Sequence, residues 1–173
     1  MTQKARVVLQ DAKFAIVRHS KTLQSEEFRA SWFAIIGLLR AVGHVLDKVD
    51  AEASPAVKRA VHEKWRELQA SKPEPKIFWG FIEHERNRFL KNYEHGISRS
   101  LTVPAATPGY CVTVDGGNSQ GGQFAPGAEY DSKISDGPYA GAYEREIALQ
   151  AHDWLKAYLD EIDVLACKYR EDA

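Results

Sequence analysis

Apolar residues recur every three or four positions along most of the chain, a spacing that predicts α-helices. The first predicted helix covers residues 4–19. The second begins near Ser25, where Glu26 and Glu27 suit the positive end of a helix dipole, and runs to about Asp50. The first helix has one face formed by Val8, Ala12, Ala15, Ile16 and His19. The second carries a broader stripe that needs more than one neighbour to bury it: Phe28, Trp32, Ile35, Leu39, Val42 and Leu46.

Two further helices follow from local start and stop signals. Ser54 can cap a helix whose first residue is Pro55, and the prolines of "KPEP" (72–75) end that helix. The fourth predicted helix runs from about residue 77 to residue 95, and Gly96 is its expected stop.

The stretch 100–138 interrupts the helical pattern, because it holds seven of the 12 glycines and four of the seven prolines. It contains one strand signal, "YCVTV" (110–114), followed by a turn-like "DGGN". A long final helix is predicted from Pro138 onward, with one face formed by Tyr143, Ile147, Trp154, Tyr158, Ile162, Leu165 and Tyr169. The predicted fold is therefore all-α, an antiparallel bundle of about five helices with a Gly/Pro-rich loop or small β-hairpin excursion before the last helix.

The length and charge bound the functions that this fold can serve. With 173 residues the chain fits a single domain, residues 1–173, that is large enough to bury a core. The formal net charge of −1 gives no overall attraction to nucleic acid, so RNA binding would need a local patch. The two cysteines, Cys111 and Cys167, suggest neither a disulfide framework nor a zinc site.

The most apolar run, residues 28–46, has about the length of a membrane span. It contains Arg29, Arg40 and His44, so a buried amphipathic helix is the better interpretation. Residues 1–13 carry charges throughout and lack the apolar core of a signal peptide. We therefore expect a cytoplasmic protein with no membrane contact.

The segment "EHERNRFLKNYEH" (83–95) concentrates charges and histidines on the fourth predicted helix. At about 100° per residue, Glu85 and Arg86 fall on the apolar face, where charges are rarely buried without partners. Arg40 and Asp47 on the second helix are candidate partners, and such a network would either fix helix pairing or line a cleft. The candidate binding or network residues are Arg40, His44, Asp47, Glu85, Arg86, Asn87 and Asn92.

A polar strip along one edge of that helix, formed by His84, Arg88, Asn92 and His95, offers catalytic candidates. The order of the helices, the 28–46 helix and the later "ERN" resemble the HEPN superfamily of helical domains, over residues 4–96 and the last helix. The resemblance implies a homodimer and, in metal-independent endoribonucleases, an arginine followed after four to six residues by a histidine. Arg88 and His95 have six residues between them, and seven steps of helix would bring them back to nearly one face. Arg86–Asn87 instead matches the polar residue that usually follows the arginine, but His95 is nine positions further on, on the opposite face.

In an active site of this kind, His95 would take the proton from an RNA 2′-hydroxyl and Arg88 would stabilise charge on the phosphate. The resemblance implies a 2′,3′-cyclic phosphate product and no metal. The structural alternative for His95 is a residue at the helix C-terminus that complements the helix dipole next to Gly96.

No metal or cofactor is expected. The sequence has no Glu-x-x-His, the pair that di-metal helical bundles use. The glycine-rich "DGGNSQGG" (115–122) lacks the Lys-Ser/Thr of a phosphate-binding loop.

Three hypotheses on function stay open at this point. The leading one is a non-catalytic HEPN-like module that binds RNA, a nucleotide or a protein partner. The second is a metal-independent endoribonuclease that uses Arg88 and His95. The third is a structural homo-oligomeric protein whose charged network only specifies pairing.

Overall fold

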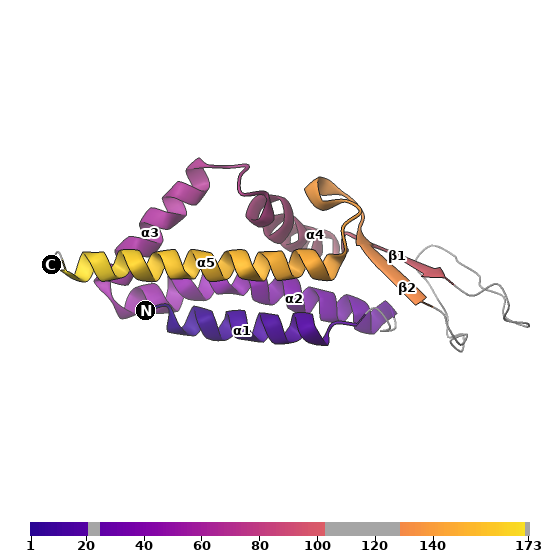
Figure 1. The fold of residues 1–173 in the computed structure, drawn as a ribbon, viewed down its shortest axis with the longest axis horizontal. Helices are drawn as coiled ribbons and strands as arrows, with labels where there is room; N and C mark the ends of the chain where they lie inside the picture. The colour runs from indigo at the N-terminus through magenta and orange to yellow at the C-terminus, as the bar shows by residue number, and fades with distance from the viewer. Residues whose placement is uncertain (21–24, 103–128, 172–173) are drawn as a thin grey trace, which may run out of the picture.

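The computed structural model describes residues 1–20, 25–102 and 129–171. Within these ranges the chain forms a bundle of α-helices with a small β-hairpin before the last helix, as predicted (Figure 1). The helices are α1 (Gln3–Arg18), α2 (Ser25–Val45), α3 (Pro55–Ala70), α4 (Glu83–Asn92) and α5 (Glu144–Glu171). The antiparallel strands are β1 (Ile97–Thr102) and β2 (Glu129–Ile134).

The helical path contains two π-helical turns. One, Leu46–Asp50, continues α2 and is followed by a 3-10 turn at Ala51–Ala53. The other, Ile77–Ile82, leads directly into α4. Ser54 is extended and Pro55 opens α3, so the predicted restart of the helix is confirmed.

The core lies where α5 runs beside α1 and α2 along the long axis of the molecule (Figure 1). Helix α3 also packs on α5. The stripe predicted for α2 is confirmed, since all six of its side chains are buried. Residues Ser25–Ala53 are long and apolar enough to cross a membrane by length and composition alone. In the bundle, the stripe of α2 faces the core.

The fourth helix ends earlier than predicted. Its last residue is Asn92, because Tyr93 adopts a left-handed conformation with φ of 56°. His95 and Gly96 therefore lie in the connection to β1 and are not on the helix. The expectation that Arg88 and His95 share a helical face is wrong for this reason.

The last helix begins at Glu144 and not at Pro138. A 3-10 turn at Gly137–Tyr139 and a left-handed Gly141, with φ of 83°, separate β2 from the helix. The predicted strand at 110–114 lies outside the described residues.

The base of the hairpin is closed by residues at both ends of the excursion. Ile97 lies opposite Ile134 in the strand register, and both side chains are buried. The Ser135 backbone N–H donates to the Gly96 carbonyl at 2.8 Å. This closure sets where the chain leaves α4 and where it returns to α5.

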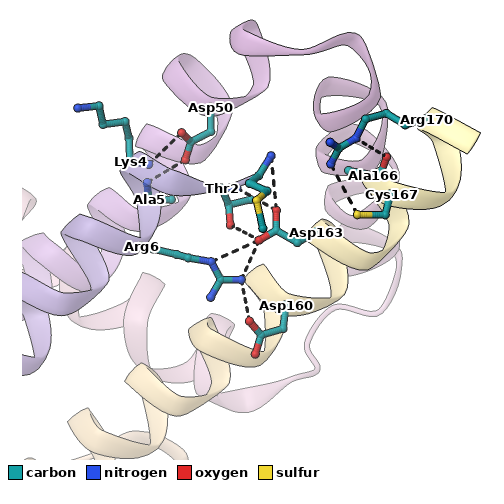
Figure 2. Close-up of polar contacts among 11 residues, drawn as sticks. Thr2, Lys4, Ala5, Arg6, Asp50, Asp160, Asp163, Ala166, Cys167 and Arg170 are labelled. Atoms are coloured by element: carbon teal, nitrogen blue, oxygen red, sulfur yellow. Dashed lines mark hydrogen bonds and ion pairs between the residues drawn. The ribbon is translucent and has the colours of Figure 1, made fainter.

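Two aspartates hold the N-terminal end of α1 (Figure 2). The buried Asp50 carboxylate accepts the backbone N–H groups of Lys4 and Ala5 at 3.0 and 2.8 Å, and so caps α1 from another helix. Asp163 on α5 accepts from Thr2 and from the Arg6 guanidinium, the latter at 2.8 Å. Burial opposes charge on Asp163, but the hydrogen bonds from Arg6 and Thr2 outweigh it and lower its pKa.

Candidate functional site

Glu85 lies at the centre of the charged segment and is buried, as predicted, with 4% of its surface exposed. Its carboxylate accepts the Trp32 indole N–H at 3.2 Å and the Gly96 backbone N–H at 3.1 Å. The Arg88 guanidinium lies 3.6 Å from its other oxygen. A Cβ atom at residue 96 would overlap both Glu85 and Arg88, so only glycine permits this approach.

Arg88, one of the two predicted catalytic residues, is bound by carboxylates on two sides. Besides Glu85, it contacts both carboxylate oxygens of Asp136, which follows β2. The hydrogen bond with Asp136 raises the pKa of Arg88, and the same bond lowers the pKa of Asp136. This pairing ties α4 to the exit of the hairpin and engages both terminal nitrogens of the guanidinium with carboxylates.

His95, the other predicted catalytic residue, is half-buried against the rings of Phe28 and Phe33, at centroid distances of 6.0 and 6.4 Å. Its Nδ1 accepts the Ile97 backbone N–H at 3.3 Å. In the neutral ring the proton is then on Nε2, so neither nitrogen is left to accept a substrate proton. Burial lowers the pKa of His95, the charge of Glu85 opposes this, and Arg29 and Arg99 add to the lowering.

The predicted network between α2 and α4 forms with other partners. Arg40 pairs with Glu83, 3.4 Å from its Nε, instead of Glu85. Glu83 and Glu85 are two positions apart, so they point to nearly opposite sides of the helix, Glu83 toward Arg40 and Glu85 toward Trp32. The expected pairing of Glu85 with Arg40 is therefore corrected.

The other predicted network residues have local contacts. Asp47 contacts Lys48 at 2.7 Å and His62 at 4.0 Å. The Arg86 guanidinium donates to the Asn87 side chain at 2.9 Å. Asn92 is exposed at the end of α4.

Three of the predicted residues nevertheless meet at one place, the mouth of a pocket of about 230 Å³ between α2, α3 and α5. Arg40, His44 and Asp47 line it from the α2 side, and His62 lines it from α3. Its aromatic walls are Trp65, Phe78, Trp154 and Tyr158. The helical spacing places Trp154 and Tyr158 on one face of the last helix but gives no sign of a pocket beside them.

The aromatic walls of the pocket form a continuous set. The rings of Trp154 and Tyr158 stack at 5.3 Å with an angle of 18°, and Phe78 lies 5.4 Å from Trp154. Burial raises the pKa of Tyr158 to about 12, so its hydroxyl stays protonated at neutral pH. The pocket thus combines planar apolar walls with a polar mouth, the usual composition of a small-molecule site.

A second polar group, which the sequence did not reveal, lies at the other end of the bundle. His19, at the end of α1, is 3% exposed, and its Nδ1 is 2.9 Å from the Ser31 hydroxyl. Its Nε2 lies 3.8 Å from the buried carboxylate of Glu144. Burial, with the charges of Arg99 and Arg145, lowers the pKa of His19 to about 4. The helical spacing placed His19 on an apolar face but could not indicate Glu144.

Over the described residues, the fold is an all-α helical bundle with a pocket between α2, α3 and α5 that is suited to a small ligand. No protein-family model, curated protein or solved structure matches the chain.

Proposed function

We propose that this chain is a non-catalytic, HEPN-like module that binds a nucleotide, or an unpaired base of RNA, in the pocket between α2, α3 and α5. The observation that carries the proposal is the combination of four aromatic side chains with a mouth of polar and cationic ones. Nucleobases bind proteins by stacking on aromatic rings, and every base has a planar face for this contact.

The stacked pair of Trp154 and Tyr158 gives one wall on which a base can lie. At about 230 Å³ the pocket is smaller than most drug-sized sites, which span roughly 300–1,000 Å³. A ligand of one or two fused rings suits this size.

The mouth supplies groups for the polar part of such a ligand. His44 and His62 lie at the opening with Arg40, whose guanidinium also pairs with Glu83. Histidine and arginine donors suit a phosphate, and the Asp47 carboxylate suits a ribose hydroxyl or a base N–H.

The contacts of the predicted catalytic pair support a binding role over ribonuclease activity. Arg88 is bound to Asp136 and Glu85, and His95 Nδ1 accepts a backbone N–H. A ribonuclease would need the arginine donors and one imidazole nitrogen available to RNA.

Binding is measured by titrating AMP and UMP into the protein and following tryptophan fluorescence and heat. Both nucleotides are expected to bind the parent protein, and Trp154→Leu is expected to weaken binding about tenfold, since stacking contributes roughly 1–3 kcal/mol per base. His62→Ala is expected to weaken binding as well. Its matched control is His84→Ala, because the two histidines are 51% and 49% exposed and each lies near one aspartate, Asp47 and Asp136. A folded parent that binds neither nucleotide, or equal affinity in Trp154→Leu, would contradict the proposal.

Cleavage of a mixed-sequence RNA in EDTA separates the binding module from the ribonuclease. No cleavage is expected from the parent, nor from Arg88→Lys or His95→Gln, with circular dichroism confirming that each is folded. Cleavage by the parent that both substitutions abolish would show that the chain is an enzyme and would refute the non-catalytic role.

A further inference from the structure

A second cavity, the α2–α4 hollow, lies beside the pocket and shares two residues with it. It has a volume of about 290 Å³ and is lined by residues of α2 and α4. Arg40 and His44 line both cavities. Of the other α2 residues, Gly43 lines the pocket, and Gly37 and Ala41 line the hollow. At about 100° per residue these positions follow one another around the helix, so Arg40 and His44 form a ridge between the two cavities.

The ridge offers hydrogen-bond donors to both cavities. Arg40 approaches Glu83 with its Nε, at 3.4 Å, while its Nη1 extends to the pocket side and lies 3.5 Å from where a Cβ on Gly43 would be. His44 is exposed one helical turn further on. Residues four apart are neighbours on a helix surface, so one phosphate group on the ridge can contact both side chains.

Arg86 adds a second guanidinium from the α4 side of the hollow. It donates to the Asn87 side chain at 2.9 Å, and it pairs with no carboxylate in the part of the chain that the structure describes. This hydrogen bond uses one of the five N–H donors of the guanidinium. Because Glu83 balances the charge of Arg40, Arg86 gives the hollow its positive charge, which suits an anionic group.

The remaining walls of the hollow suit a flat apolar group. Phe89 lines it, and stacking on Phe33 at a centroid distance of 4.0 Å and an angle of 24° holds its ring in place. Leu90 beside it is 59% exposed. On the α2 side, a Cβ built on Gly37 meets nothing within 4 Å, so a planar ring can approach the helix backbone there. The hollow thus repeats the combination of aromatic wall and cationic group found in the pocket.

We infer that the pocket and the α2–α4 hollow together bind a dinucleotide, with one base in each cavity and the phosphate that joins the two nucleosides on the ridge. Arg40 and His44 bind this phosphate, and Arg86 reaches it from the α4 side. The second base lies against Phe89 and Leu90. The inference rests on the proposed function and deepens it, because a single nucleotide would leave the hollow empty.

Titration calorimetry with AMP and with ApA, two adenosines joined by a 3′–5′ phosphodiester, tests the second cavity. ApA is expected to bind at least about tenfold more tightly than AMP, because stacking of a second base adds affinity. ApA carries less negative charge than AMP, so charge alone would favour AMP. A form of ApA that lacks one of its two bases is the matched control, and it is expected to bind no more tightly than AMP.

Gly37→Leu fills the hollow and leaves the pocket open. The leucine has room within its own chain, so circular dichroism of the variant should match that of the parent. The variant is expected to lose the tenfold advantage of ApA and to bind AMP as the parent does. The matched control is Ala30→Leu, an exposed position seven residues earlier on α2, which is expected to change neither affinity. Arg86→Gln gives a second test, and it is expected to weaken ApA about fivefold and AMP less.

The outcomes separate this inference from the proposed function. Equal affinities of the parent for AMP and ApA, or an ApA advantage that persists in Gly37→Leu, would overturn the dinucleotide site and leave the one-base site standing. A parent that binds neither ligand would overturn both. Oligoadenylate of ten nucleotides then identifies the source of the two bases. Binding as tight as that of ApA indicates two neighbouring nucleotides of a strand, and binding at least tenfold weaker indicates a free dinucleotide, and both results support the two-base site.

Discussion

Replacing Glu85 with alanine is expected to lower the free energy of unfolding by about 3–5 kcal/mol. The substitution removes a buried carboxylate that accepts hydrogen bonds from Trp32 and Gly96 and pairs with Arg88. The indole and backbone N–H groups would then be left without an acceptor, a loss that is added to the loss of the ion pair. Urea-induced unfolding followed by circular dichroism measures the change.

Two comparisons make the result specific to the buried position. Glu67→Ala removes an exposed glutamate that pairs with Lys64 at 2.7 Å, and it should cost less than about 1 kcal/mol. Glu85→Gln keeps one acceptor oxygen and should fall between the two, at roughly 1–3 kcal/mol. If Glu85→Ala does not fold, the glutamine variant still gives a measurable value. Equal losses for Glu85→Ala and Glu67→Ala would show that the buried carboxylate has no special role.

The second large effect is a loss of stability in mild acid that depends on His19. In the unfolded chain this histidine binds a proton near its ordinary pKa of 6.5, whereas in the folded protein it does so only near pH 4. Between these values the unfolded state holds more protons, so acidification favours unfolding. The difference corresponds to about 3 kcal/mol of stability that is present at pH 7 and lost by about pH 4.

Glu144 acts in the opposite direction, so the His19 effect is read from a difference. Burial raises the pKa of Glu144, which makes the folded state hold a proton that the unfolded state has already released as the pH rises. The unfolding free energies of the parent and of His19→Gln are therefore compared at several pH values from 7 to 4. The parent should lose about 3 kcal/mol relative to the variant over this range. The exposed His62→Gln is the control, and its unfolding free energy should change with pH as that of the parent does. If the unfolding free energies of the parent and of His19→Gln also fall in parallel, His19 is ruled out as the cause.

Local signals in the sequence were sufficient for most of the helical framework. Pro55 after Ser54 correctly predicts the start of α3, and the spacing of apolar residues correctly predicts the buried face of α2. Both signals depend only on neighbours along the chain. The stop of α4 shows the limit. The sequence predicts Gly96 as the stop of the helix, but α4 ends at Asn92, and the missing side chain of Gly96 instead allows the approach of Glu85, eleven residues earlier.

The site residues depended on contacts that no spacing reveals. Helical geometry placed Glu85 on the buried face, yet its acceptor role toward Trp32 joins residues 53 positions apart. His19 and Glu144 meet although 125 positions separate them in the sequence. The pocket likewise joins Asp47 to Trp154, which the pattern assigned to separate roles. Which of several acidic and basic side chains contact one another is decided by how the helices pack in three dimensions.

The closed base of the hairpin has a consequence for how the chain can change in length. Ile97 opposite Ile134, and the Ser135 N–H on the Gly96 carbonyl, fix the two ends of the excursion next to each other. When two ends of a chain are already held together, each doubling of the loop length between them adds only about 0.6 kcal/mol to the cost of closing the loop. The position between β1 and β2 is therefore a place where evolution or an engineer can insert new sequence, even a whole domain, while the bundle below keeps its fold.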